Sequence, residues 1–143
     1  MKLGLKSFVI QSILVKGVVA DDHGNNFSSA TQITVDNAGY WGRIDKKGDV
    51  DFFKINIPDP LVSEIVFRIT DLSPEMLPEL KVYDSNEKLL QQKIYEVGNR
   101  YILSISIKPD GNNIFYASVN YARDDGTGTY SISAGPRKSS DTP

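Results

Sequence analysis

Two short acidic stretches carry the residues best suited to chemistry. The first spans Asp21 to Asn26 and the second spans Asp45 to Asp51, and together they supply five carboxylates and two side-chain amides. Each stretch contains a glycine, which lets the backbone bend sharply. Ca²⁺ takes about six to eight oxygen ligands in a flexible shell. We therefore expect the stretches to meet and share one Ca²⁺, although Asp, Asn and Gly are also the usual residues of solvated turns.

Catalytic chemistry finds little support in the sequence. His23 is the only histidine, and a Ser-His-Asp triad would have to use it without any Gly-x-Ser-x-Gly nucleophile motif. A catalytic zinc needs several protein ligands around an open position. Asp49 and Asp51 lie on one loop, whereas glycosidases place two carboxylates across a cleft. We predict no catalytic residue and keep a small hydrolase only as an alternative.

Composition narrows the classes of partner. The 143 residues suit one domain, and the formal net charge of −2 gives no field that would attract nucleic acid or an anionic membrane. The chain has no cysteine, which excludes disulfides and cysteine-based metal sites. A metal that binds only the folded state is another way to stabilise such a domain. We expect a monomer with no bound nucleic acid.

Residues 1–20 form an N-terminal extension of uncertain type. Lys2 and Lys6 precede the apolar run Ser7 to Val15, and the residues up to Ala20 resemble a signal-peptide cleavage site. Lys16 interrupts the apolar stretch, which is also shorter than the ~20 residues that span a bilayer. A signal peptide, a linker and an additional strand all remain open.

Alternation of apolar and polar residues, with a period of two, dominates residues 31–134 and predicts short strands separated by turn residues. The expected strands are Gln32–Val35, Tyr40–Ile44, Phe52–Ile57, Glu64–Thr70, Leu80–Tyr83, Leu89–Ile94, Tyr101–Ile107, Ile114–Tyr121 and Thr129–Ala134. Eight or nine such strands predict an all-β fold, an antiparallel sandwich or jelly roll over residues 21–135, followed by a polar tail at 136–143.

The same alternation directs some side chains outward. Trp41 faces away from Tyr40 and Gly42, and Tyr116 and Ser118 also face outward. Exposed aromatic rings on a sheet are a common means of stacking on sugars or on extended polypeptide. Trp41 and Tyr116 are therefore candidate ligand-binding residues, unless the N-terminal segment or a neighbouring domain covers them.

Four blocks of sequence, in this order, resemble the bacterial pre-peptidase C-terminal domain, a β-sandwich appended to exported hydrolases. The blocks are Asp21–Thr31, Gly42–Phe53 with its Gly-Asp-x-Asp-aromatic-Phe motif, Leu80–Asn86, and Thr127–Ile132. Glu87 departs from the pattern, because a glycine is more typical at that position of the turn.

The resemblance implies a non-catalytic accessory domain of a secreted or periplasmic bacterial hydrolase. Its partner would be the parent catalytic domain or an extracellular polymer, which leaves a carbohydrate- or matrix-binding module as the main alternative. Some members, including collagen-binding modules of collagenases, bind Ca²⁺ between the opening segment and the central block. Carried over to this chain, the implied ligands are Asp22, Asn25, Asp49 and Asp51, with Asp21 and Asp45 as secondary candidates.

Overall fold

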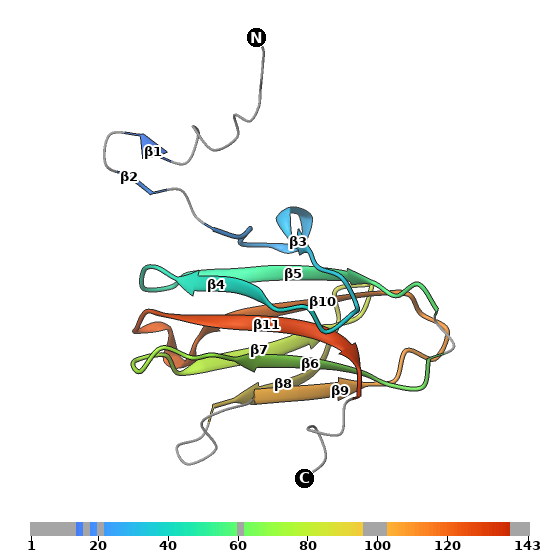
Figure 1. Ribbon diagram of the computed structural model, residues 1–143. Helices are drawn as coiled ribbons and strands as arrows, with labels where there is room; N and C mark the ends of the chain where they lie inside the picture. Colours follow the sequence, from blue (N-terminus) through green and yellow to red (C-terminus); the bar gives the residue numbers. More distant parts are fainter. Residues whose placement is uncertain (1–13, 16–17, 20–21, 60–61, 96–102, 138–143) are drawn as a thin grey trace.

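Two facing sheets form the body of the protein in the computed structural model, which describes residues 14–15, 18–19, 22–59, 62–95 and 103–137 (Figure 1). One sheet has five strands in the order β3 (Thr31–Gln32), β5 (Val50–Asn56), β10 (Ile114–Tyr121), β7 (Pro78–Tyr83) and β8 (Leu89–Ile94). The other has four, in the order β4 (Tyr40–Ile44), β11 (Gly128–Pro136), β6 (Ile65–Thr70) and β9 (Leu103–Ile107). The described residues thus confirm the predicted β-sandwich.

Smaller elements complete the description. A two-stranded ladder pairs β1 (Leu14–Val15) with β2 (Val18–Val19) and belongs to neither large sheet. Two short 3-10 turns, η2 (Phe27–Ser29) and η3 (Ala122–Asp124), lie before β3 and after β10. Among the described residues, no helix has the length and apolar character that crossing a membrane would require.

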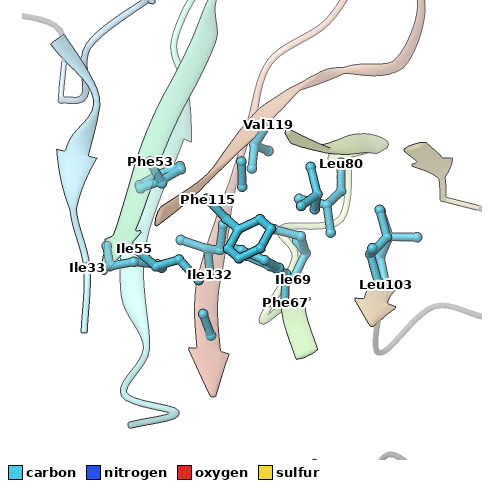
Figure 2. Packing of buried hydrophobic residues seen from close by; sticks show 14 of the residues in the cluster. Ile33, Phe53, Ile55, Phe67, Ile69, Leu80, Leu103, Phe115, Val119 and Ile132 are labelled. Carbon is cyan, nitrogen blue, oxygen red and sulfur yellow. The ribbon is translucent and has the colours of Figure 1, made fainter. Parts of the chain in front are cut away.

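Alternating side chains of both sheets meet between them and form the core. Phe53 and Ile55 of β5 and Phe115 and Val119 of β10 face Phe67, Ile69 and Ile132 of the other sheet, as Figure 2 shows. Each of these seven side chains is buried. Burial of this apolar surface, at about 25 cal/mol per Å², is the main force that holds the two sheets together.

The observed strands agree closely with the expected ones where alternation is continuous. Tyr40–Ile44, Leu89–Ile94 and Ile114–Tyr121 have the predicted bounds, and the other strands differ mainly at their ends. Residues 101–102 of one expected strand lie outside the described residues. The clearest difference is β3, which ends at Gln32 and pairs with β5 in parallel, whereas the expected sandwich was antiparallel throughout. Ile33 continues this pairing through its N–H, which donates to the Lys54 carbonyl at 2.9 Å.

Candidate metal centre

The two acidic stretches meet at one end of the sandwich. Asp22 precedes η2, Asp49 lies in the turn between β4 and β5, and Asp51 is on β5. One carboxylate oxygen from each lies within 4.8 Å of the others, an arrangement that could hold a metal ion. Asp49 and Asp51 are buried, and Asp22 is largely so. The convergence expected from the sequence is therefore present, whereas metal binding stays a prediction.

Backbone hydrogen bonds fasten the first stretch to both sheets. The Phe52 N–H of β5 donates to the Gly24 carbonyl at 2.8 Å. The Arg43 N–H of β4 donates to Asp22 Oδ2 at 2.6 Å. Gly24 is required for close packing, since a Cβ there would lie 1.9 Å from the Ser29 carbonyl oxygen. These contacts place the Asp22 carboxylate at the end of the sheet.

The second stretch owes its shape to a tight turn. The Asp49 N–H donates to the Lys46 carbonyl at 3.1 Å, and Gly48 between them has a φ of +82°, which favours glycine. The turn brings the Asp45 N–H to 3.1 Å from Asp49 Oδ2, so the backbone fixes the orientation of this carboxylate. Asp49 and Asp51, two residues apart on an extended chain, then point to the same side.

Tyr130 of β11 contacts the cluster from the core side, and the sequence analysis did not identify it as a residue of the site. Its hydroxyl donates to Asp51 Oδ2 at 2.5 Å. Tyr130 lies opposite Gly42 of β4, where a Cβ would come within 2.3 Å of the phenol ring. The available signal was an inward-facing tyrosine with a glycine on the neighbouring strand. Burial, reinforced by the charge of Asp51, raises the pKa of Tyr130 well above its ordinary value, so the phenol stays neutral and donates.

The cluster brings like charges together in a largely dry place. The three hydrogen bonds described above that reach these carboxylates all go to Oδ2 atoms, and the Oδ1 atoms of all three carboxylates are buried as well. Like charges at this separation disfavour one another's ionisation unless a cation compensates them. An all-oxygen, all-carboxylate donor set suits a hard cation such as Ca²⁺ or Mg²⁺ rather than zinc or copper.

His23 supports the cluster from the side. Its Nε2 lies 2.9 Å from the Trp41 carbonyl and its Nδ1 lies 2.9 Å from Thr31 Oγ1. A carbonyl only accepts, so Nε2 carries the proton and donates to Trp41. The imidazole also packs on Phe53, with ring centroids 4.7 Å apart. His23 thus joins the first stretch to β3, β4 and β5, and these contacts use both of its ring nitrogens.

Of the remaining predicted ligands, the two that the structure describes, Asn25 and Asp45, lie in less favourable places. Asn25 is exposed, and its neighbour Asn26 caps η2 instead. The Asp45 carboxylate lies 3.9 Å from the Arg43 guanidinium. Asp21 is outside the described residues. Among the described residues, the structure therefore brings together three of the predicted metal ligands, Asp22, Asp49 and Asp51.

The two predicted ligand-binding aromatics do not share a face. Trp41 is 58% exposed on the outside of the four-stranded sheet, where the Arg43 guanidinium lies 5.7 Å from its ring. Tyr116 is on the outside of the five-stranded sheet, against Phe27 at 5.2 Å. A single ligand-binding surface cannot use both rings.

The fold has a counterpart among solved structures. The pre-peptidase C-terminal domain of a collagenase from Bacillus anthracis superposes with a TM-score of 0.54, at 21% sequence identity, over 78% of this chain and 99% of that chain. At this identity the likeness establishes the fold. The sequence matches no family model and no curated protein. The fold expected from the four sequence blocks is confirmed.

Proposed function

We propose that this chain is a non-catalytic accessory domain of an exported bacterial peptidase or other hydrolase, and that one Ca²⁺ ties its opening segment to the sandwich. The observation that carries the proposal is the convergence of Asp22 from the first stretch with Asp49 and Asp51 from the second. The fold shared with the collagenase domain supports the accessory role. By the same likeness, the domain would work outside the cytoplasm beside a parent catalytic domain.

The choice of Ca²⁺ follows from the ligands. Three carboxylates from a loop, a turn and a strand form an irregular group, and Ca²⁺ accepts irregular shells of oxygen. Mg²⁺ demands near-octahedral geometry and gives up its waters reluctantly. Water and further oxygens of the first stretch, where Asn25 lies, would complete the shell. The ion would compensate the mutual repulsion of the carboxylates and would link the first stretch to the second.

Thermal unfolding with and without Ca²⁺ tests the proposal. Ca²⁺ at about 100 times its dissociation constant stabilises a folded state by ~2.7 kcal/mol. We expect EDTA to lower the melting temperature and added Ca²⁺ to restore it. Asp22→Asn and Asp51→Asn should remove most of this response, because each takes one negative charge from the shell.

Asp110→Asn is the matched control. Asp110 is exposed in the turn before β10 with a φ of +52°, which asparagine tolerates well. This variant should keep the full response to Ca²⁺. A melting curve of the parent protein that is the same in EDTA and in Ca²⁺ would refute the metal site and leave only the fold.

A further inference from the structure

A hollow of about 400 Å³ opens on the outer face of the five-stranded sheet, over β5, β10 and β7. Its volume falls within the ~300–1,000 Å³ that is typical of small-molecule sites. The hollow does not include the acidic cluster. Asp51 points to the core side of β5, whereas its neighbours Val50 and Phe52 point outward and line the hollow.

The sizes of neighbouring side chains create the hollow. Ser118 of the central strand β10 lies between Phe52 on β5 and Lys81 on β7. Two residues further along the same face of β10, Asn120 lies between Val50 and Glu79. Ser118 is short, and the longer side chains of Phe52, Lys81 and Glu79 beside β10 leave a trough along this strand. Ser118 and Asn120 are buried beneath these neighbours. Their polar groups are already hydrogen-bonded, Ser118 to the Tyr83 hydroxyl and Asn120 to Glu79 and the Tyr121 carbonyl.

A fixed group of aromatic rings closes one end of the trough. Phe27 contacts Phe52 and Tyr83, with ring centroids 4.8 and 4.9 Å apart. The Phe52 and Tyr83 rings are stacked, 6.1 Å apart at 26°. The Tyr83 hydroxyl also hydrogen-bonds to Ser118 Oγ at 3.1 Å. Because these rings hold one another in place, a ligand that packs on them would pay little ordering entropy.

The charges around the trough favour an anion. Lys81 and Arg123 both line it, and within the described residues neither makes a hydrogen bond or an ion pair with its side chain. Among the described residues that line the trough, the one carboxylate is that of Glu79, which accepts a hydrogen bond from Asn120 Nδ2 at 3.2 Å. Two cations against one such carboxylate give the trough a local positive charge, although the whole chain has a net charge of −2.

We propose that this trough binds an acidic saccharide, with a uronic-acid unit of a polysaccharide seated over β10 between Phe52 on β5 and Lys81 on β7. Its carboxylate would lie between Lys81 and Arg123, and the apolar side of its ring would rest against the aromatic group. A polypeptide fits less well. The backbone groups of β5, β10 and β7 are used in ladders here, so strand addition, which needs a sheet edge, cannot occur. This inference goes beyond the proposed Ca²⁺ tie and does not depend on it.

Calorimetric titration with defined oligosaccharides tests the proposal at a fixed Ca²⁺ concentration. The probes are hexasaccharides of hyaluronan and of galacturonic acid, each compared with its carboxyl-reduced, uncharged form. We expect at least one acidic hexasaccharide to bind, and its reduced form to bind about tenfold or more weakly, since hydrogen bonds to charged groups are worth ~1.5–3 kcal/mol. The double variant Lys81→Gln/Arg123→Gln should lose affinity to a similar extent.

Control variants distinguish binding in the trough from a general attraction of the acidic saccharide to positive charges on the protein. Lys108→Gln removes one positive charge at an exposed position beyond β9, on the other sheet, and should leave binding unchanged. Melting curves of each variant would verify that it folds. Asp51→Asn should lose the response to Ca²⁺ yet still bind the saccharide, which distinguishes failure of the metal site from failure of the trough.

Three results would overturn the proposal. The first is no binding of either acidic hexasaccharide, and the second is equal binding of the acidic and reduced forms. The third is binding that the double variant leaves intact. A collagen-like triple-helical peptide that binds the parent protein but not the double variant would assign the trough to a polypeptide ligand instead.

Discussion

At the residue scale, Tyr130 places a hydrogen-bond donor inside the apolar core. The alternation of the strand predicts that the Tyr130 side chain points inward, but it does not predict this role. Its ring is fully buried between the sheets and lies edge-on to Phe53, with centroids 6.4 Å apart. Its hydroxyl reaches the Asp51 carboxylate at 2.5 Å. A charged acceptor in a place of low dielectric makes this hydrogen bond stronger than an exposed one.

Removing that donor should cost measurable stability. Tyr130→Phe keeps the ring and takes away the hydroxyl, so the buried Asp51 carboxylate loses a donor. We expect a loss of about 2 kcal/mol in the free energy of unfolding in EDTA, as for other hydrogen bonds to charged groups. Urea unfolding measures it. Tyr121→Phe is the control, because the Tyr121 hydroxyl donates at an exposed place to the Glu75 carbonyl. Equal effects of the two changes would contradict the special role of Tyr130.

Glu64 should make stability depend on acid pH. Hydrogen bonds from Arg137 and Ser106 hold the pKa of Glu64 at about 2, below its ordinary 4.5. A depressed pKa contributes stability that is full above about 4.5 and is lost as the pH falls towards 2. Glu64→Gln should therefore flatten the melting temperature between these pH values relative to the parent protein.

The control for this effect is a carboxylate outside the ion pair. Glu75→Gln changes an exposed glutamate and should leave the slope of the parent curve unaltered. Other carboxylates of the protein titrate in the same range, but the difference between the two curves isolates Glu64. Parallel curves for Glu64→Gln and the parent protein would show that the ion pair with Arg137 does not form in solution.

At the element scale, the β7–β8 hairpin keeps its turn despite an unfavourable residue. Asp84 Oδ1 accepts from the Asn86 and Lys88 N–H groups, and the Glu87 N–H donates to the Asp84 carbonyl. Glu87 then has a φ of +66°, in the left-handed region that glycine occupies more readily. The glycine expected at this position would suit the observed backbone conformation better than glutamate does.

Glycine at position 87 should therefore stabilise the hairpin. A left-handed conformation costs a residue with a Cβ roughly 1–2 kcal/mol, part of which the greater freedom of an unfolded glycine offsets. We expect Glu87→Gly to raise the free energy of unfolding by about 0.5–1 kcal/mol, measured by urea unfolding. Asn86→Gly lacks this benefit, since the backbone of Asn86 does not have a positive φ, and it should destabilise. A Glu87→Gly variant as unstable as Asn86→Gly would show that the turn carries no strain.

The elements also show which parts of the fold sequence reasoning can reach. Ile114–Tyr121 was predicted with its observed bounds because its alternation is unbroken between two turns. β3 was not, because its two residues owe their strand conformation to β5, a partner remote in sequence. The proximity of Asp22 and Asp51 was expected from a family resemblance and from the chemistry of the carboxylates. The hydrogen bond from Tyr130 was not expected, because the space for its ring comes from the missing Cβ of Gly42 on the neighbouring strand, and alternation alone does not show which residues lie opposite each other.

At the scale of the whole molecule, residues 22–37 act as a strap across one side of the sandwich (Figure 1). They pair with β5 through β3 and hydrogen-bond to β4 through Asp22. Further along, the Asn37 N–H donates to the Ala134 carbonyl of β11, and Asn37 Oδ1 accepts from the otherwise buried Arg68 at 2.5 Å. The strap thus contacts both sheets, and the acidic cluster lies at its beginning.

A Ca²⁺ at the start of the strap should protect particular backbone amides from hydrogen exchange. The Phe52 N–H bonds to the Gly24 carbonyl, and the Arg43 N–H bonds to Asp22 Oδ2, so both amides report on whether the strap is closed. Local opening exposes such amides without unfolding the core. In EDTA the three carboxylates repel one another, and we expect both amides to exchange faster, while amides in the β7–β10 ladder keep their rates under conditions where the protein stays folded. NMR-detected exchange with Ca²⁺ and with EDTA measures both classes. If removing Ca²⁺ accelerated all amides equally, the ion would stabilise the sandwich as a whole and the strap would not open by itself.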